Sequence, residues 1–345
     1  MKKLSVIGHF AFGKEFLDGQ TIKTKVLSKE FENQLGSDQV LKIDTHGVKK
    51  NLLKSPFQVI KALKTSANVM IFPAHNGVRV YAPLLLFFKR FFKNRKIYYN
   101  VIGGWLAKFL ENKKGLAKKL KKFDGLYVET STLKSVLEGM GFTNVSVMPN
   151  GKDIDALKES ELVYSENEPY KLCTFSRVMK QKGIEEAVNA VIYANEYFER
   201  TVYSLDIYGQ VDNSETEWFE NLQKTFPEYI KYGGLVPFDK SVEVLKDYFA
   251  LLFPTRFYTE GIPGTIIDAY AAGLPIISAK WLNYSDILDD SVCIGYDFND
   301  SEKLKEILLD ENLKDKLNGI KVNCLKKASE YKPSSVVKEF IERIK

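Results

Sequence analysis

Short apolar runs alternate along the chain with longer segments in which apolar residues recur every three or four positions. A short apolar run between turn residues is typical of a buried strand, and the longer period is typical of an amphipathic helix. In the first half, strands are predicted at 4–8, 39–44, 68–73, 96–103, 125–130 and 145–149. Helices are predicted among them at 21–35, 56–66 and 131–141. This order predicts a parallel sheet flanked by helices.

The alternation pauses at 156–170, which is polar, acidic and aperiodic, and then resumes. Further strands are predicted at 171–177, 204–209, 230–234, 250–255, 274–279 and 292–296. Helices are predicted at 183–198, 215–226, 241–249 and 265–273, with further helices from about 301 to 345. We therefore predict an α/β protein with two Rossmann-like domains, at 1–155 and 171–325, joined by a linker at 156–170. A last helix within 326–345 is expected to pack on the N-terminal domain. Parallel sheets bind ligands at the carboxyl ends of their strands, so we expect the ligands in a cleft between the domains.

The amino-acid composition excludes several classes of protein. The 345 residues carry a net charge of +6 and include only three cysteines and three histidines. Well-separated cysteines exclude a disulfide scaffold and a thiolate metal centre, and they suit a reducing cytoplasm. The apolar run at the N-terminus is too short for a signal peptide, and we find no run of about 20 apolar residues that could span a membrane.

The loop after the first strand, GHFAFGKE (8–15), nearly matches a phosphate-binding P-loop. Glu15 stands where that motif needs a hydroxyl for Mg²⁺, so we interpret the loop as a glycine-rich turn. Gly19 and Gln20 then open a helix whose N–H groups could face an anionic ligand, and we expect both residues to contact it. The alternative is that Asp18 or Thr21 only caps this helix.

The segment 250–279 predicts a strand, a loop and a helix that begins near Thr265. Glycines in the loop let a ligand approach the backbone, and a helix N-terminus offers free N–H groups to a phosphate. Glu260 and Asp268 flank this helix start, where carboxylates suit sugar and ribose hydroxyls. The alternative is that both carboxylates are solvated at a helix start.

A basic element follows the first strand of the second domain. Arg177 ends that strand and Lys182 precedes the next helix. An arginine fork and a lysine point charge could bind a diphosphate at the strand ends. The alternative is two ordinary surface cations.

Together, these motifs resemble the retaining GT-B glycosyltransferases of family 4. The signature E-G-x₆-E-A-x-A-x-G-x-P-V-I is matched here by EGIPGTIIDAYAAGLPII, from Glu260 to Ile277. The resemblance implies that Arg177 and Lys182 bind the diphosphate of a nucleotide-sugar and that Glu260 contacts the donor sugar. Asp268 stands where the family has a glutamate that binds ribose. The remaining donor contacts implied by the resemblance fall at Gly209, Val236, Gly261, Ile262, Pro263, Gly264 and Thr265.

The first domain departs from the family pattern. Many relatives have a histidine after the fourth strand, where this chain has Gly103, Gly104 and Trp105. His75 could substitute on the acceptor side, or it could be an ordinary loop histidine. Two basic-apolar stretches, 84–96 and 111–123, could contact an anionic membrane. The alternative is that the apolar side of 111–123 packs on its own sheet.

The sequence thus predicts a metal-independent, retaining hexosyltransferase without a resident cofactor, which uses a nucleotide-diphosphate sugar as co-substrate. Its acceptor is expected to be a glycan, lipid-linked, in cell-surface polysaccharide synthesis, with peripheral contact to the inner membrane face and no nucleic acid partner. Two alternatives stay open: a sugar-nucleotide epimerase-like enzyme and a non-catalytic sugar-nucleotide-binding partner.

Overall fold

The computed structural model of the chain describes residues 1–14 and 19–345, and it describes side chains in these ranges except at 48–52. The predictions for Glu15 and Asp18 lie outside the described residues. The chain divides into two compact units. The first unit consists of Met1–Asp153, Glu260–Gly264 and Glu330–Lys345, and the second of Ile154–Thr259 and Thr265–Ser329. The grouping of 260–264 with the first unit is not foreseen from the sequence.

The first unit contains a six-stranded parallel sheet in the order β2-β1-β3-β4-β5-β6. Its strands are β1 (Lys2–Gly8), β2 (Val40–Asp44), β3 (Ser66–Ile71), β4 (Lys96–Asn100), β5 (Gly125–Val128) and β6 (Val145–Val147). The strand order reverses between β1 and β3, and such a switch point leaves a crevice at the carboxyl ends of the strands.

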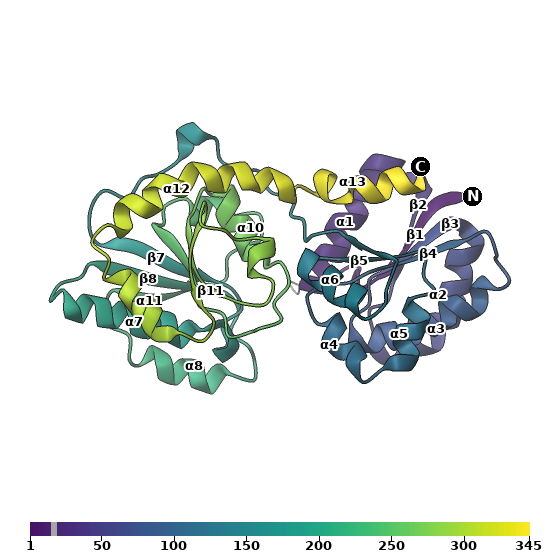
Figure 1. Ribbon diagram of the computed structural model, residues 1–345, viewed down its shortest axis with the longest axis horizontal. Coiled ribbons are helices and arrows are strands. Elements are labelled where there is room, and N and C mark those ends of the chain that lie inside the picture. The colour runs from purple at the N-terminus through teal and green to yellow at the C-terminus, as the bar shows by residue number, and fades with distance from the viewer. Residues whose placement is uncertain (15–18) are drawn as a thin grey trace. The chain divides into compact units, whose positions relative to one another are not determined.

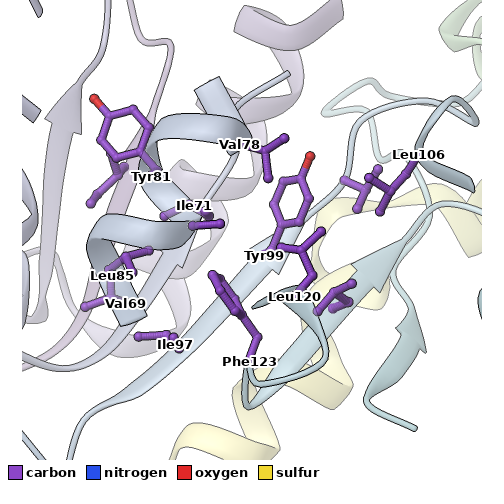
Figure 2. Packing of buried hydrophobic residues seen from close by; sticks show 14 of the residues in the cluster. Val69, Ile71, Val78, Tyr81, Leu85, Ile97, Tyr99, Leu106, Leu120 and Phe123 are labelled. Atoms are coloured by element: carbon purple, nitrogen blue, oxygen red, sulfur yellow. The ribbon is translucent and has the colours of Figure 1, made fainter. Parts of the chain in front are cut away.

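Helices cover both faces of this sheet, as Figure 1 shows. They are α1 (Gly19–Leu35), α2 (Val48–Thr65), α3 (His75–Lys89), α4 (Leu106–Glu111), α5 (Lys114–Leu120), α6 (Ser131–Gly139) and α13 (Pro333–Ile344). Side chains alternate along β1, so Val6 points to a core formed with α1 and α13, and Ile7 to a core formed with α2 and α3. Figure 2 shows part of the second of these cores, around Ile71, Tyr99 and Leu120.

The second unit contains a six-stranded parallel sheet in the order β12-β11-β10-β7-β8-β9. Its strands are β7 (Tyr170–Phe175), β8 (Tyr203–Tyr208), β9 (Ile230–Gly234), β10 (Ala250–Phe253), β11 (Ile276–Lys280) and β12 (Cys293–Asp297). Its helices are α7 (Ile184–Tyr197), α8 (Thr216–Gln223), α9 (Ser241–Leu245), α10 (Gly264–Ala271), α11 (Ser301–Leu308) and α12 (Leu313–Ala328). Read from β9, this is the 3-2-1-4-5-6 order of a dinucleotide-binding sheet, and its switch point lies between β7 and β10.

All twelve strands predicted from the sequence are present, within a few residues at their ends. The predicted fold class, two Rossmann-like α/β domains, is confirmed. The helix α3 is not among the predicted elements, because its apolar run around 81–88 hides the three-to-four-residue period. The helix predicted at 241–249 is shorter, since Tyr248 and Phe249 leave it to enter the core. In the described part of the chain, no helix is both long enough and apolar enough to cross a bilayer.

Candidate functional site

Arg177 lies at the switch point of the second sheet, two residues beyond the end of β7. Its side chain is half-exposed, and one guanidinium nitrogen lies 3.5 Å from the Asp212 carboxylate. This pair is long and exposed, so it contributes little stability and leaves the guanidinium available to a stronger anion. The position therefore suits a phosphate ligand.

Lys182 lies in the same loop after β7 and reaches the end of the adjacent strand β10. It ends the short 3-10 helix Lys180–Lys182, and its ammonium lies 5.8 Å from the ring centroid of Phe253, the last residue of β10. Gly183 follows with a φ of 70°, and a Cβ there would lie 1.9 Å from the Pro254 carbonyl oxygen. Only glycine allows this approach, which holds Lys182 at the end of β10.

Gly209 lies just beyond β8, and its conformation is also specific to glycine. Its φ is 134°, and a Cβ would lie 1.8 Å from the carbonyl oxygen of Ser176. Its N–H donates to the Gly234 carbonyl at 2.9 Å, at the end of β9, two residues before Val236. The strand ends that carry Arg177, Gly209 and Val236 are therefore neighbours along one edge of the sheet.

The first turns of α10 contribute Thr265 and Asp268. The Thr265 hydroxyl is buried and lacks a hydrogen-bond partner among the described residues. A buried hydroxyl without a partner is costly, and a ligand oxygen at this helix start would satisfy it. The Asp268 side chain is only 2% exposed and accepts a hydrogen bond of 2.7 Å from the Ser241 hydroxyl. Its contact with a ribose stays a prediction.

The segment Glu260–Gly264 carries the other predicted donor residues and groups with the first unit. Glu260 is partly exposed, whereas Gly261, Ile262 and Pro263 are buried. A Cβ at Gly261 would lie 2.8 Å from the Cα of Gly103, so two predicted glycines meet here. Their neighbour Glu129 could not be singled out from the sequence, because a single glutamate at a strand end gives no recognisable motif.

The first unit has a cavity of about 310 Å³ at its own switch point, between the ends of β1 and β3. Its lining includes His9, Gln20, Thr45, His75 and Asn76. Gln20 is one of the predicted donor contacts; its amide donates to the Phe72 carbonyl at 3.3 Å. Gly19, predicted with it, begins α1.

His9 and Thr45 line this cavity but were not singled out from the sequence. The ring nitrogens of His9 lie 2.6 Å from the Thr21 hydroxyl and 3.0 Å from Nδ1 of His46. Thr45 follows the end of β2. Their positions in the sequence could have identified them, because His9 and Thr45 each directly follow a strand that ends at this edge of the sheet.

His75 stacks on Trp105, with ring centroids 3.7 Å apart, and meets the edge of Phe109. Burial and the nearby Lys113 cation lower the pKa of His75 from its ordinary value near 6.5. The imidazole is therefore neutral at pH 7. The structure thus joins His75 and Trp105, two of the predicted acceptor-side residues. Gly104, beside Trp105 in the chain, is buried.

The described part of the loop after β1, residues 9–14, does not offer a phosphate cradle. The N–H groups of Phe10, Ala11 and Phe12 all donate to the carboxylate of Asp44, at 3.0–3.2 Å. Burial alone would raise the pKa of Asp44, but hydrogen bonds from His46 and from these three amides lower it. Because a carboxylate of the protein already fills this nest of amides, the described part of the loop behaves as a turn.

The apolar side of the basic stretch 111–123 is used within the first unit. Leu120 and Phe123 are buried in the core, and Leu116 packs against it. The apolar side of this stretch therefore packs on its own domain, as one of the two alternatives predicts, and its contact with a membrane stays a prediction. In the other stretch, 84–96, Phe87 and Phe91 are exposed.

In the described residues, no three His, Cys, Asp or Glu side chains are grouped so that they could hold a metal ion.

Residues 169–310 match the family model described as glycosyl transferases group 1. A comparison with curated proteins gives no match. The matched segment contains the Glu260–Ile277 motif and Arg177, on which the resemblance rested. The resemblance to group 1 glycosyltransferases is therefore confirmed.

Several solved structures are similar. HepE of Anabaena in complex with UDP has a TM-score of 0.73 and 12% identity, covering 100% of this chain and 99% of that one. The lipopolysaccharide outer core galactosyltransferase WaaB has a TM-score of 0.68 and 14% identity, with 100% and 99% coverage. A TarM mutant of S. aureus, in complex with fondaparinux, alpha-GlcNAc-glycerol and UDP, has a TM-score of 0.66 and 14% identity. This chain covers 59% of the TarM chain, and 85% of this chain is aligned. At these identities the likeness shows the GT-B fold.

Proposed function

We propose that this chain, a GT-B protein with a glycosyl transferases group 1 segment, moves a hexosyl unit from a nucleotide-diphosphate sugar to a glycan acceptor. One observation carries the proposal. Arg177 and Lys182 both lie in the loop after β7, at the switch point of the second sheet, and the Lys182 ammonium reaches the end of the adjacent strand β10, inside the matched segment 169–310. A diphosphate is the ligand that best fits two cations at the carboxyl edge of such a sheet.

The donor chemistry follows from this placement. When the bond between the sugar and the diphosphate breaks, negative charge develops on the leaving phosphate. Arg177 and Lys182 stabilise that charge, and the unpaired Thr265 hydroxyl donates a hydrogen bond to a donor oxygen. Cations of the protein take the role that a metal ion plays elsewhere, so the proposed transfer needs no metal.

Two further parts of the proposal come from the resemblance. Glu260 binds hydroxyls of the donor sugar, and the sugar keeps its anomeric configuration on transfer. The similar solved structures support a nucleotide-sugar donor. UDP is bound in the HepE and TarM structures, and WaaB is named as a galactosyltransferase.

We assign the acceptor to the first unit. Its switch-point cavity of about 310 Å³ is lined by neutral hydrogen-bonding groups, among them Thr45 and Asn76. His75 lies in the same lining. Amide and hydroxyl groups together with a flat ring suit a sugar, which presents hydroxyls at its rim and C–H groups on its faces.

Ligand binding tests the donor site. UDP and UDP-hexoses should raise the melting temperature of the wild-type protein, because a ligand that binds only the folded state stabilises it. The variants Arg177→Ala and Lys182→Ala should lose most of this shift. The control is Arg200→Ala, which removes an exposed arginine of the same unit that pairs with Glu168. Equal shifts for all four proteins would refute the site.

Turnover tests the reaction. Glu260→Gln should lower transfer from the donor that binds, and the product should keep the anomeric configuration of the donor sugar. Turnover should be unchanged by EDTA. Loss of turnover in EDTA that Mg²⁺ restores would overturn the metal-independent part, and an inverted product would overturn retention.

The proposal extends to a lipid-linked acceptor and peripheral contact with the inner face of an anionic membrane. Phe87 and Phe91 are exposed on one side of the 84–96 stretch, with ring centroids 6.0 Å apart, next to Arg90 and Lys93. Exposed aromatics beside cations are typical of an interfacial anchor. The three cysteines are buried free thiols, in keeping with a reducing cytoplasm.

Vesicle co-sedimentation tests this contact. The wild-type protein should sediment with vesicles that contain anionic lipid at low salt and not with neutral vesicles. Phe87→Ala combined with Phe91→Ala should weaken sedimentation, whereas the same change at exposed Phe238 of the second unit should not. Absence of wild-type binding to anionic vesicles would refute the membrane contact and leave the donor site unaffected.

A further inference from the structure

The first unit holds a buried ion pair between α1 and the end of β5. The Lys23 ammonium lies 2.7 Å from one carboxylate oxygen of Glu129, and both side chains are almost fully buried, at 1% and 4% exposure. Lys23 also donates to the Val101 carbonyl at 3.4 Å. Burial lowers the pKa of Lys23, and the charge of Glu129 opposes this effect.

The other oxygen of Glu129 contacts the segment Glu260–Gly264. It accepts a hydrogen bond of 3.1 Å from the N–H of Ile262. The carbonyl of Ile262 in turn accepts from the Asn150 amide at 3.2 Å. Both polar groups of this one peptide residue are therefore fixed by side chains of the first unit.

Gly261 shows how closely the segment is held. A Cβ there would lie 2.2 Å from the same Glu129 oxygen and 2.8 Å from the Cα of Gly103. Side chains larger than hydrogen cannot occupy this space without moving the segment or the carboxylate.

A buried ion pair is a poor source of stability, because an apolar pair of the same volume usually stabilises a protein as well or better. What this pair does provide is a fixed orientation of the Glu129 carboxylate. Lys23 holds one of its oxygens, so the other oxygen points at the Ile262 N–H. We propose that Lys23 and Glu129 are a positioning pair that fixes Glu260–Gly264 in the conformation that binds the donor sugar. This inference rests on the proposed function, in which Glu260 contacts that sugar.

The test compares affinities for UDP and for the UDP-hexose that the wild-type protein binds best, measured by calorimetry. Because Arg177 and Lys182 bind the diphosphate, loss of the positioning pair should weaken the UDP-hexose and spare UDP. A merely structural role would weaken both ligands or neither.

Two double variants separate the effect of the buried charges from the effect of the hydrogen bond to Ile262. Lys23→Met with Glu129→Gln removes both charges and keeps an oxygen that can accept from Ile262. Lys23→Met with Glu129→Leu removes that acceptor as well. We expect the leucine variant to lose about tenfold or more in UDP-hexose affinity relative to UDP, and the glutamine variant to lose clearly less. The control is Lys29→Met with Asp153→Leu, an exposed pair that also starts from α1; its affinity ratio should be that of the wild type.

Gly261→Ala provides an independent variant that leaves the ion pair in place. It should reduce the UDP-hexose affinity relative to UDP, as the leucine double variant does. Gly139→Ala, in α6 of the same unit and outside the proposed binding residues, is the matched control, since a Cβ at Gly139 meets nothing within 4 Å.

The outcomes separate the two levels of the proposal. A wild-type protein that binds neither UDP nor a UDP-hexose would refute the proposed function, and the positioning pair with it. Normal wild-type binding with an unchanged ratio in the leucine variant and in Gly261→Ala would refute the positioning pair alone. Unfolding curves show whether each variant folds. If either the leucine double variant or Gly261→Ala fails to fold, the ratio of UDP-hexose to UDP affinity in the other variant decides the test.

Discussion

Lys321 of α12 carries a buried charge whose effect on stability depends on pH. Its side chain is 1% exposed, and its ammonium donates to a neutral acceptor, the Tyr248 carbonyl, at 3.3 Å. Burial lowers the pKa of Lys321 from 10.5 to about 8. Because each pKa unit corresponds to about 1.4 kcal/mol, keeping this charge in the folded protein costs about 3 kcal/mol at pH 7.

The sign follows from proton binding. Between pH 8 and 10.5 the unfolded chain holds a proton on Lys321 that the folded chain has released. The free energy of unfolding therefore rises with pH between pH 8 and 10.5. Below pH 8 the full cost of keeping Lys321 charged is present. Lys321→Met removes the cost, but it also leaves the Tyr248 carbonyl without its donor, a loss of about 1 kcal/mol. We expect the variant to be about 2 kcal/mol more stable than wild type at pH 7 and about equal at pH 10.

Denaturant unfolding at pH 7, 8, 9 and 10 measures this difference. The protein has three tryptophans. In a Trp105→Phe background, the remaining Trp218 and Trp281 both lie in the second unit and report its unfolding alone. Lys326→Met, on an exposed position of the same helix, is the control and should differ little from wild type at any pH. A difference between Lys321→Met and wild type that stays constant or grows with pH would refute the argument.

Four further outcomes are expected. Phe340→Ala should destabilise the first unit by about 3–5 kcal/mol, since this buried ring packs against three other aromatic rings; denaturant unfolding followed by Trp105 fluorescence, in a background with Trp218→Phe and Trp281→Phe, measures it. Gly209→Ala should cost the second unit about 2 kcal/mol or more, because its Cβ would collide with a carbonyl oxygen, and unfolding curves would show the loss. Asp44→Asn should lower stability at neutral pH. That deficit should shrink as pH falls below about 4, because the pKa of Asp44 is lowered in the folded state and its contribution is lost on protonation; unfolding at pH 3–7 checks this. The imidazole of His75 should titrate below pH 6.5 in an NMR titration, because burial lowers its pKa.

Each of these outcomes has a matched comparison. Phe91→Ala removes a ring that is 72% exposed and should change stability by less than about 0.5 kcal/mol. Gly234→Ala also places a Cβ at positive φ but meets nothing within 4 Å, so it should cost less than Gly209→Ala. Asp38→Asn, at an exposed carboxyl, should leave the acid dependence unchanged. Lys113→Met should raise the His75 titration midpoint, because the Lys113 charge adds to the effect of burial; a midpoint that does not move would contradict that charge effect.

The strands and the fold class follow directly from the sequence. A strand buried on both faces must be a short apolar run, so each of the twelve strands is visible without tertiary information. The placement of Arg177 and Gly209 at one edge of the second sheet could also be predicted. Each follows such an apolar run, and parallel strands place their carboxyl ends on one edge. The helix α3 was missed for the opposite reason, since its apolar residues are too numerous to show a period.

Several features depended on contacts between residues far apart in the chain. Whether the loop after β1 is a phosphate cradle was decided by Asp44, whose carboxylate takes the amides that a phosphate would need. Whether Leu120 and Phe123 face lipid or core was decided by the sheet beneath them. A spacing rule compares neighbours along the chain, and it cannot tell which distant side chain fills a turn or covers a helix face.

The sequence by itself determined the strands of two Rossmann-like domains and the position of Arg177 at a strand end, because strand periodicity and the residue following a strand are local properties. The tertiary structure alone decided that Gly261 meets Gly103 and that Glu129, held by Lys23, receives the Ile262 N–H. These residues are separated by more than a hundred positions, and their meeting depends on how a sheet and its helices pack, which no local pattern encodes.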